Sequence, residues 1–367
     1  MRRLPVAVSA AFPDPAGLPL PCSGIRGLRV FLASPDPAAI HDAFSASALV
    51  GECGAVECWL DPGPQQHLQD PNTCGSTDAK DRAFTQSPHS AATVDDPAAS
   101  AATPAATTIG WRGSVEAAVA LANEQLADWA GMLSIPQPGN LVIRLRSAVH
   151  HQLEVEDYDL AAVSGLPLGC PAALASALAS LHSALKMGGE LFISALLCNR
   201  RLGSYVSGEV LEAAGVGPVM YFEDFVNALR AAGFCQPRVV RIEPWDLQGG
   251  DEEAQYILLN SNLSTFQIRA QKNRLLEGTC EDYGQWVVYK GTLEGSDEAY
   301  TLDLNHRLVR NQPLMVCGNT AAILGDAGIS WLSRHFIISG DRSVHYGAFM
   351  GGGGVPRTTE RCCLWRG

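Results

Sequence analysis

Several features that mark other protein classes are missing from this chain of 367 residues. Its longest apolar runs, such as Leu191 to Leu197, are far shorter than the ~20 residues that cross a bilayer, so we expect no membrane partner. The formal net charge is −12 and the Lys and Arg residues form no basic stripe, so we expect no nucleic-acid partner. No two cysteines have the C-x-x-C spacing, which argues against a structural zinc site.

The cysteines that are present favour a reducing compartment. There are 11 of them at irregular spacing, and no signal peptide precedes them, so we interpret them as free thiols and expect a cytoplasmic protein. The opening Met1-Arg2-Arg3, followed by a stretch without acid until Asp14, leaves an organellar presequence as the alternative.

The first part of the chain has a β-α-β pattern that is then interrupted. Residues 28–33 and 55–60 are predicted to be strands, and residues 38–50 between them a helix. Residues 62–108 are rich in Pro, Ser, Thr, Ala, Asp and Gln and have no hydrophobic periodicity, so we predict a disordered insert. Order returns with an amphipathic helix over residues 114–132.

Strands and helices then alternate. We predict strands over residues 141–145, 158–163, 190–197 and 239–243, and helices over residues 171–186 and 222–233. This alternation is typical of a parallel, doubly wound α/β sheet. Short alternating segments from about residue 262, at 286–290, 299–304 and 334–338, predict a smaller α+β domain.

These patterns divide the chain into four parts. Residues 1–26 form an N-terminal arm, residues 27–261 the doubly wound domain with its insert, residues 262–350 the C-terminal domain, and residues 351–367 a flexible tail.

Four phrases carry a resemblance to a known family. They are Leu185-Lys186-Met187-Gly188-Gly189-Glu190-Leu191-Phe192, Glu281-Asp282-Tyr283-Gly284-Gln285, Val316-Cys317-Gly318-Asn319-Thr320 and His345-Tyr346-Gly347. The first resembles the turn before a late sheet strand of class I methyltransferases. The other three, in this order, resemble the C-terminal half of the arsenite S-adenosylmethionine methyltransferases.

The resemblance implies a class I methyltransferase domain joined to an arsenic-handling C-terminal domain. The family transfers a methyl group from S-adenosylmethionine to thiol-bound As(III). The resemblance therefore implies S-adenosylmethionine as the cofactor and, for an active protein, a trivalent arsenical or its thiol conjugate as the partner.

The glycine-rich turn of such enzymes is absent. The family pattern Asp-x-Gly-x-Gly-x-Gly falls on residues 32–38, which read Leu-Ala-Ser-Pro-Asp-Pro-Ala, and no glycine lies between Gly27 and Gly51. Glycine lets a backbone approach a cofactor closely, whereas the two prolines stiffen the loop and remove N–H donors. We therefore expect weak or no S-adenosylmethionine binding.

Asp61 is the candidate cofactor-binding residue. It follows the second predicted strand, where the family places a carboxylate that accepts hydrogen bonds from the ribose hydroxyls. The alternative is that Asp61 only caps the turn before Pro62, and the sequence leaves both interpretations open.

Arsenic requires soft thiol ligands that converge on one atom. The two cysteines that the family pattern implies are replaced by Leu166 and Gly215. The remaining candidate arsenic thiols are a displaced pair, Cys170 and Cys198, and a tail pair, Cys362 and Cys363. The alternative interpretation is that Cys170 and Cys198 are buried structural thiols.

Other residues of the matched phrases have a structural interpretation. Cys317 matches the family pattern but is not one of its arsenic ligands, and a packing role in a tight turn explains it. His345, Tyr346 and His306 invite an acid/base role, although aromatic packing explains them equally well. No catalytic residue is assigned.

Three interpretations follow. The protein is an arsenite methyltransferase-like enzyme with doubtful activity, a non-catalytic paralogue that binds or regulates, or the product of a gene model in which low-complexity sequence replaces true exons around residues 62–108.

Overall fold

The computed structural model describes residues 18–21, 25–35, 39–60, 139–145, 153–247, 250–326 and 330–350. The predicted insert and the predicted helix over residues 114–132 lie outside these ranges, as do Asp61, Cys362 and Cys363. Within the described part of the chain, no helix combines the length and the apolar character that a membrane crossing needs.

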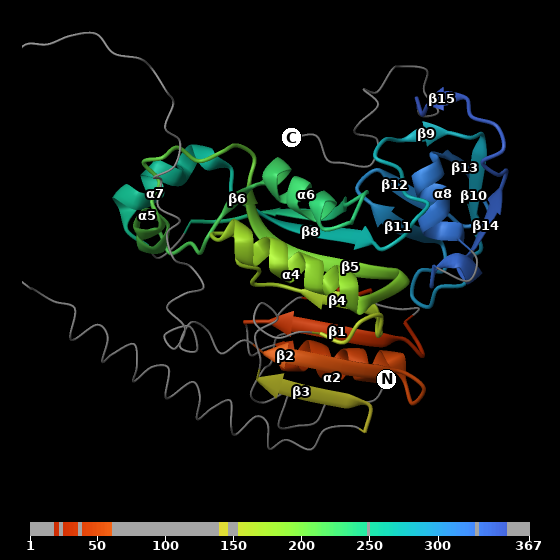
Figure 1. Cartoon of the computed structure of the whole chain (residues 1–367), viewed down its shortest axis with the longest axis horizontal. Coiled ribbons are helices and arrows are strands. Elements are labelled where there is room, and N and C mark those ends of the chain that lie inside the picture. Colours follow the sequence, from red (N-terminus) through yellow and green to blue (C-terminus); the bar gives the residue numbers. More distant parts are fainter. Residues whose placement is uncertain are drawn as a thin grey trace, which may run out of the picture. The chain divides into compact units, whose positions relative to one another are not determined.

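An eight-stranded sheet in the order β3-β2-β1-β4-β5-β8-β7, with β6 paired to β5, forms the centre of the fold (Figure 1). β1 pairs in parallel with both β2 and β4, so the strands predicted over residues 28–33 and 158–163 are neighbours in one sheet. β3 and β5 extend the parallel part, whereas β8 runs antiparallel to β5 and β7. The strands are β1 Arg29–Ser34, β2 Ala55–Leu60, β3 Leu141–Leu145, β4 Tyr158–Val163, β5 Leu185–Cys198, β6 Met220–Tyr221, β7 Arg238–Pro244 and β8 Ser264–Gln271.

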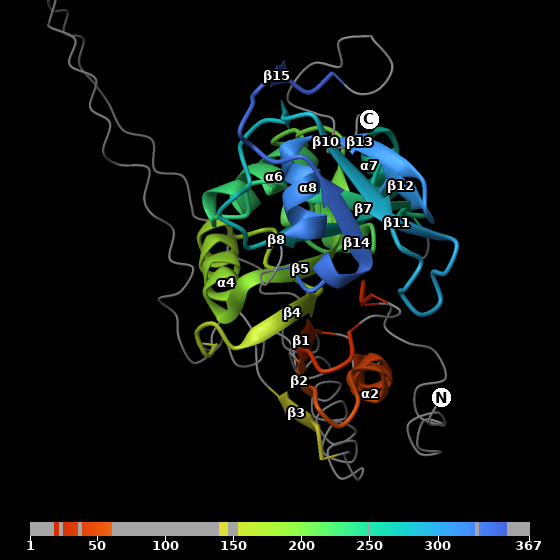
Figure 2. The same ribbon diagram turned by 90° about the vertical axis from the view of Figure 1, so that its right-hand side faces the viewer.

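Helices cover both faces of this sheet, as a doubly wound fold requires (Figure 2). α2 Ala39–Val50 packs on β1 and β2, and α4 Pro171–Ala184 and α6 Phe222–Ala231 share the main hydrophobic core on the other face. α4 buries Leu174, Ala177, Leu178, Leu181 and Ala184, whose spacing places them on one helical face. Two shorter helices, α5 Gly208–Ala213 and α7 Glu252–Leu258, pack together beside the sheet.

The prediction that the helix continues to Lys186 was wrong. α4 ends at Ala184, and β5 begins at Leu185, whose backbone is extended. The pairing of β5 with β4 skips from Leu185 to Glu190, so the glycine phrase bulges out of the ladder. A Cβ on Gly189 would lie 2.9 Å from the Lys186 carbonyl oxygen, which explains why glycine occupies this bend.

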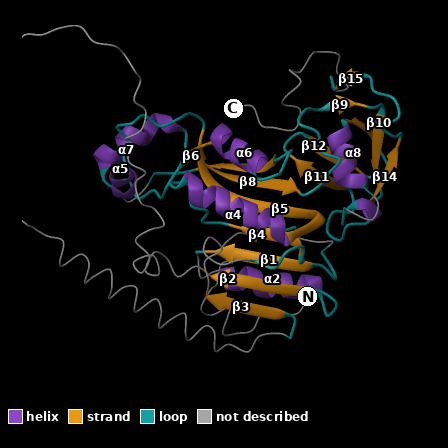
Figure 3. Ribbon diagram, viewed as in Figure 1, coloured by secondary structure: helices purple, strands orange, loops and turns teal. Residues whose placement is uncertain are grey.

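The C-terminal part consists of small sheets around one helix (Figure 3). α8 Gly318–Gly325 packs on a three-stranded antiparallel sheet of β13 Pro313–Val316, β10 Gln285–Tyr289 and β14 Phe336–Ser339. β11 Ala299–Asp303 pairs with β12 His306–Val309, and β9 Glu281–Asp282 pairs with β15 Gly347–Ala348. Short 3-10 helices cover Leu259–Ser261 and Ser333–His335.

β8 lies beyond residue 261 in the chain but within the large sheet. The predicted smaller domain from residue 262 thus begins with a strand that pairs with β5 and β7. The limits of the four predicted parts stay a prediction.

Buried arginines of the sheet hold the C-terminal part. Arg269 of β8 lies 2.6 Å from the Glu190 carboxylate of β5 and donates to the Tyr300 hydroxyl of β11 at 2.8 Å. Arg238 of β7 donates to Asp303 at 2.7 Å and to Thr320 of α8 at 2.9 Å. Arg238 and Asp303 are each only 1% exposed, so this pair is removed from solvent.

Asp303→Asn is expected to lower the free energy of unfolding by about 3–5 kcal/mol, because it leaves Arg238 buried without its counter-charge. Burial alone would raise the pKa of Asp303, but the hydrogen bond from His306 and the charge of Arg238 hold it at about 2, below the ordinary 3.8. The carboxylate therefore stabilises the fold fully above pH 3.8, and this contribution is lost as the pH falls toward 2. Urea unfolding of both proteins between pH 7 and pH 2 measures this.

Glu243→Gln is the matched control, because it breaks the exposed Arg241–Glu243 pair on the same strand as Arg238. It should change the unfolding free energy by less than about 1 kcal/mol. Similar losses in the two variants would show that the buried pair has no special role.

Candidate functional site

The first candidate site is the point where the strand order reverses. From β1 the chain proceeds to β2 on one side, and from β4 it proceeds to β5 on the other. In open α/β sheets, ligands bind beyond the carboxyl ends of the strands at such a point. The described residues there are Ser34 and Pro35 after β1 and Ser164 and Gly165 after β4.

These two loops are closed on each other. The Ser164 backbone N–H donates to the Ala33 carbonyl, and its hydroxyl donates to Ser34 Oγ, both at 2.9 Å. A Cβ on Gly165 would lie 2.6 Å from Cγ of Pro35, so the proline ring rests directly on the Gly165 backbone. Gly165 also has φ +68°, a conformation that favours glycine.

The described residues of this point do not fit a tightly held nucleoside cofactor. A cofactor cradle needs backbone N–H donors and space beside the first strand, and Pro35 supplies neither. Ser34 is 2% exposed and bonded to the neighbouring loop, so its hydroxyl is already engaged. Asp61 lies outside the described residues, directly after Leu60, the buried last residue of β2.

The displaced thiol pair takes two different environments. Cys170 is partly exposed at the N-cap position of α4, and Cys198 is fully buried at the end of β5. The Cys198 thiol donates to the carbonyl oxygens of Arg200 at 2.9 Å and Met220 at 3.4 Å, and burial raises its pKa. A protonated thiol with two acceptors suits the structural role, because a metal-like ligand must be deprotonated. The proposal that Cys170 and Cys198 bind arsenic together stays untested.

At the two positions where the family pattern implies cysteine, the residues here have structural roles. Leu166 packs against the main hydrophobic core. Gly215 has φ +72° and ends α5, with its N–H donating to the Glu212 carbonyl at 2.9 Å. A cysteine at position 215 would be strained in this conformation.

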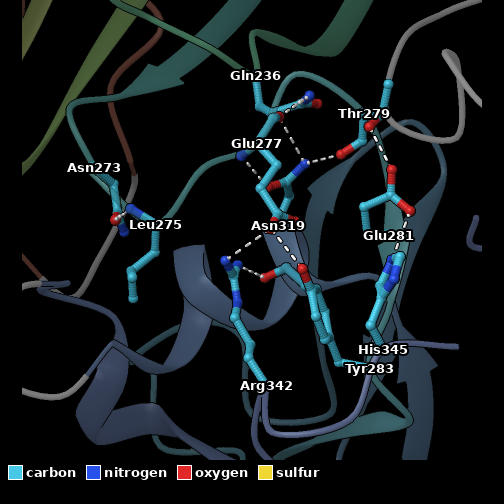
Figure 4. Close-up of polar contacts among 11 residues, drawn as sticks. Gln236, Asn273, Leu275, Glu277, Thr279, Glu281, Tyr283, Asn319, Arg342 and His345 are labelled. Carbon is cyan, nitrogen blue, oxygen red and sulfur yellow. Dashed lines mark hydrogen bonds and ion pairs between the residues drawn. The ribbon is translucent and has the colours of Figure 1, made fainter. Parts of the chain in front are cut away.

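A second candidate site is the polar cluster at the start of α8 (Figure 4). The buried Asn319 amide accepts from Glu277 N–H at 2.7 Å and donates to the carbonyls of Glu277 at 3.1 Å and Thr279 at 2.8 Å. Tyr283 donates its hydroxyl to the Glu277 carboxylate at 2.6 Å, and Arg342 donates to the Gly318 carbonyl at 2.8 Å. These contacts lock the loop before β9 onto α8.

Two of the proposed acid/base residues lie apart. His345 is half-exposed, and its Nε2 lies 3.0 Å from the Glu281 carboxylate. The centroid of its ring lies 5.2 Å from that of the Tyr283 ring. His306 is buried and pairs with Asp303 at 2.7 Å. Tyr346 is exposed, near Gly284. Within the described ranges, no group of three or more His, Cys, Asp or Glu side chains could hold a metal ion.

One buried sulfur was missed from the sequence. Cys280 is 2% exposed and shares a small apolar cluster with the fully buried Cys317 and with Phe349. The available signal was its position, since Cys280 directly precedes the phrase that begins at Glu281. Only the fold places it beside the phrase that contains Cys317.

No protein-family model matches the chain. An arsenite methyltransferase of Aquipseudomonas alcaligenes is 37% identical over 183 residues, which are 49% of this chain and 51% of that protein. An arsenite methyltransferase of Rattus norvegicus is 25% identical over 175 residues, 47% of this chain and 45% of that protein. The chain thus spans about half the length of the curated relatives it matches.

A solved structure extends the likeness to nearly the whole chain. The arsenic (III) S-adenosylmethionine methyltransferase of Chlamydomonas reinhardtii superposes with a TM-score of 0.64 and 28% identity, covering 95% of this chain and 100% of that one. The strand order β3-β2-β1-β4-β5 with an antiparallel β8 agrees with the class I methyltransferase fold. By sequence and by fold, this chain is a homologue of the arsenite S-adenosylmethionine methyltransferases.

Proposed function

We propose that this protein is an arsenite methyltransferase-like protein in which methyl transfer from S-adenosylmethionine to thiol-bound As(III) is weak or lost, and that it serves as a cytoplasmic binding or regulatory paralogue. The observation that carries the proposal is the contact of Pro35 with Gly165 at the strand-order reversal. It fills the space where a glycine-rich turn of the family type would receive the methyl donor.

The arsenic side of the family site supports the same proposal. The family reaction needs thiols that hold the acceptor beside the donor, because proximity supplies much of the rate. Leu166 and Gly215 supply no sulfur, and the Cys198 thiol is buried and bonded to two carbonyls. Either loss would be enough to reduce turnover strongly.

A second candidate is a divergent methyltransferase. It is favoured by the partly exposed Cys170, which lies at the N-cap position of α4, a helix that packs on β5. In this version Cys170 and Cys198 replace the family pair, and Asp61 holds the ribose.

S-adenosylmethionine is expected to bind with a Kd weaker than ~1 mM, equivalent to less than about 4 kcal/mol of binding free energy. The reason is the loop at Pro35, which offers neither N–H donors nor room. Isothermal titration of the full chain measures this, with the Chlamydomonas reinhardtii homologue as the positive control. A micromolar Kd would contradict the proposal.

Asp61→Ala tests the remaining cofactor contact if titration does find tight binding. Loss of a charged hydrogen bond to ribose should then weaken binding by about 1.5–3 kcal/mol. Asp297→Ala, at an exposed aspartate of a C-terminal loop, is the control and should bind as the parent does. An Asp61 variant that matches this control would leave Asp61 with only its turn-capping role.

Turnover separates the two candidate functions. Purified protein with S-adenosylmethionine, arsenite and glutathione should release no methylated arsenic above a protein-free control, because donor and acceptor are not held together. Liquid chromatography with arsenic-specific detection measures the products. Methylated arsenic that disappears in Cys170→Ser and Cys198→Ser would establish the divergent enzyme instead.

A further inference from the structure

The three-stranded sheet of the C-terminal part has an edge at each side. β10 lies in its middle, with β13 at one edge and β14 at the other, and among the described residues no further strand pairs with either edge. β14 lies at the rim of the C-terminal part in Figure 1, and it lies in front in the turned view of Figure 2. The unpaired backbone groups of such an edge are a template for pairing with another chain.

The two edges differ in whether they resist pairing. β13 begins with Pro313, which has no N–H to donate. β14 reads Phe336-Ile337-Ile338-Ser339 and contains no proline, charged residue or bulge. Its Ile337 side chain is 50% exposed. Natural edge strands are usually protected by one of these devices, so the edge of β14 has the composition of a strand that pairs.

The direction of the backbone groups of β14 follows from its pairing with β10. The Lys290 N–H donates to the His335 carbonyl at 3.0 Å, in the register of the β10–β14 ladder. Because the hydrogen-bonding direction alternates along a strand, the groups of residues 335, 337 and 339 face β10. The groups of Phe336 and Ile338, and the N–H of Gly340, therefore face the outer edge.

Two backbone groups at this edge are already engaged. The Phe336 N–H donates to the Ser333 carbonyl, and the Gly340 carbonyl accepts from the Gln285 side-chain amide at 3.4 Å. The groups that remain are the Phe336 carbonyl, the Gly340 N–H, and both the N–H and the carbonyl of Ile338. None of them has a hydrogen-bond partner in the part of the chain that the structure describes.

A two-fold axis at Ile338 matches these remaining groups with each other. Antiparallel pairing about this axis sets Ile338 opposite Ile338 of a second copy, where each N–H meets a carbonyl. It sets Phe336 opposite Gly340 of the second copy, where the open carbonyl meets the open N–H. The engaged N–H of Phe336 then lies opposite the engaged carbonyl of Gly340, so neither existing bond has to break. This self-complementarity is what an isologous interface requires.

We propose that β14 is a dimerisation edge, at which two copies of this chain pair their β14 strands antiparallel and join their small sheets into one. The side chains fit this register. Ile337 lies opposite Ser339 of the second copy, and Ser339 is paired with Trp286, which is 41% exposed. The small serine leaves room for Ile337 of one copy to pack on Trp286 of the other. The dimer is independent of the proposed function.

The charges beside β14 are complementary in the same arrangement. Arg334 precedes the strand, Asp341 follows it, and both are exposed. Antiparallel pairing brings the start of one β14 to the end of the other, so Arg334 of each copy faces Asp341 of the other. Arg342 carries the next positive charge, but it is turned inward and donates to the Gly318 carbonyl at 2.8 Å.

Sedimentation of the full chain over a concentration series under reducing conditions measures the association. A few backbone bonds and one apolar contact on each side make a small interface, so a Kd of ~0.05 mM is expected. A chain that stays monomeric at ~0.5 mM would refute the proposal.

Ile337→Lys should weaken the dimer by about tenfold or more, because a lysine protects a strand edge and the two lysines would lie near each other across the axis. Leu304→Lys is the matched control, since Leu304 is 47% exposed in the turn between β11 and β12, and it should associate as the wild type does. Circular dichroism checks the fold of both variants. Equal association of the two variants would exclude β14 as the interface.

Charge reversal tests the two-fold arrangement. Arg334→Asp and Asp341→Arg should each weaken the dimer, whereas the double variant should recover it, a recovery that general destabilisation cannot produce. A double variant weaker than either single variant would contradict the contact between Arg334 and Asp341.

Cross-linking tests the register. In the double variant Ile337→Cys/Ser339→Cys, the facing positions have Cβ atoms about 4.5–5.5 Å apart, so a mild oxidant should join position 337 of one copy to position 339 of the other. Peptide mass spectrometry identifies the link, and each single variant should give no covalent dimer through its new thiol. Links between two positions 337 or two positions 339, or no link in the double variant, would overturn the proposed pairing.

Discussion

The buried charges of Arg238 and Arg269 are the constraint on which the described structure depends. They project from β7 and β8 at one side of the large sheet and find their partners in β5, β11 and α8. An unpaired buried guanidinium is very costly, so arrangements of the C-terminal elements that leave Arg238 or Arg269 without a partner are disfavoured. Trp331 adds a third contact by donating to Glu190 at 3.0 Å. The large sheet and the small sheets thus form one folded unit through β7 and β8.

In the proposed function, this scaffold is retained while the family's methyl-transfer site is not. The phrases that resemble the arsenite methyltransferases form the β5 bulge, the loop before β10, the start of α8 and the β9–β15 ribbon, and all of them have packing roles. Hydrogen bonds hold Gly189, Asn319 and Tyr283 of these phrases in place. The strand-order reversal has no such phrase, and there the loops after β1 and β4 close on each other. A fold can outlast a site because the two depend on different residues.

Much of the fold was predictable from periodicity. The strands at β1, β2, β3 and β4 were expected within one residue of their ends, because buried parallel strands are nearly continuous apolar runs. The end of α4 was misplaced, since Lys186 continues the helical pattern and only the pairing with β4 pulls Leu185 into the sheet. The sequence also did not predict that β8 belongs to the large sheet. Its antiparallel pairing with β5 and β7 depends on residues far away in the chain and leaves no local sequence pattern.

The site was less predictable than the fold. The missing glycines before Gly51 are plain in the sequence, but the contact of Pro35 with Gly165 joins residues 130 positions apart. Likewise, a hydrogen bond from Asn319 to the Thr279 carbonyl holds the segment of Cys280 beside that of Cys317, and no local sequence pattern predicts this contact. Pairs of this kind follow from topology, which sequence spacing does not encode.

In the proposed function, a fold similar to that of the arsenite methyltransferases persists here while the methyl-donor site is closed. Chemical unfolding with and without 1 mM S-adenosylmethionine tests this proposal, since a ligand that binds only the folded state raises the unfolding free energy by RT ln(1 + [L]/Kd). A donor site with a Kd weaker than ~1 mM predicts a rise in the unfolding free energy of no more than about 0.4 kcal/mol. A rise of about 4 kcal/mol, as expected for a micromolar Kd, would contradict it.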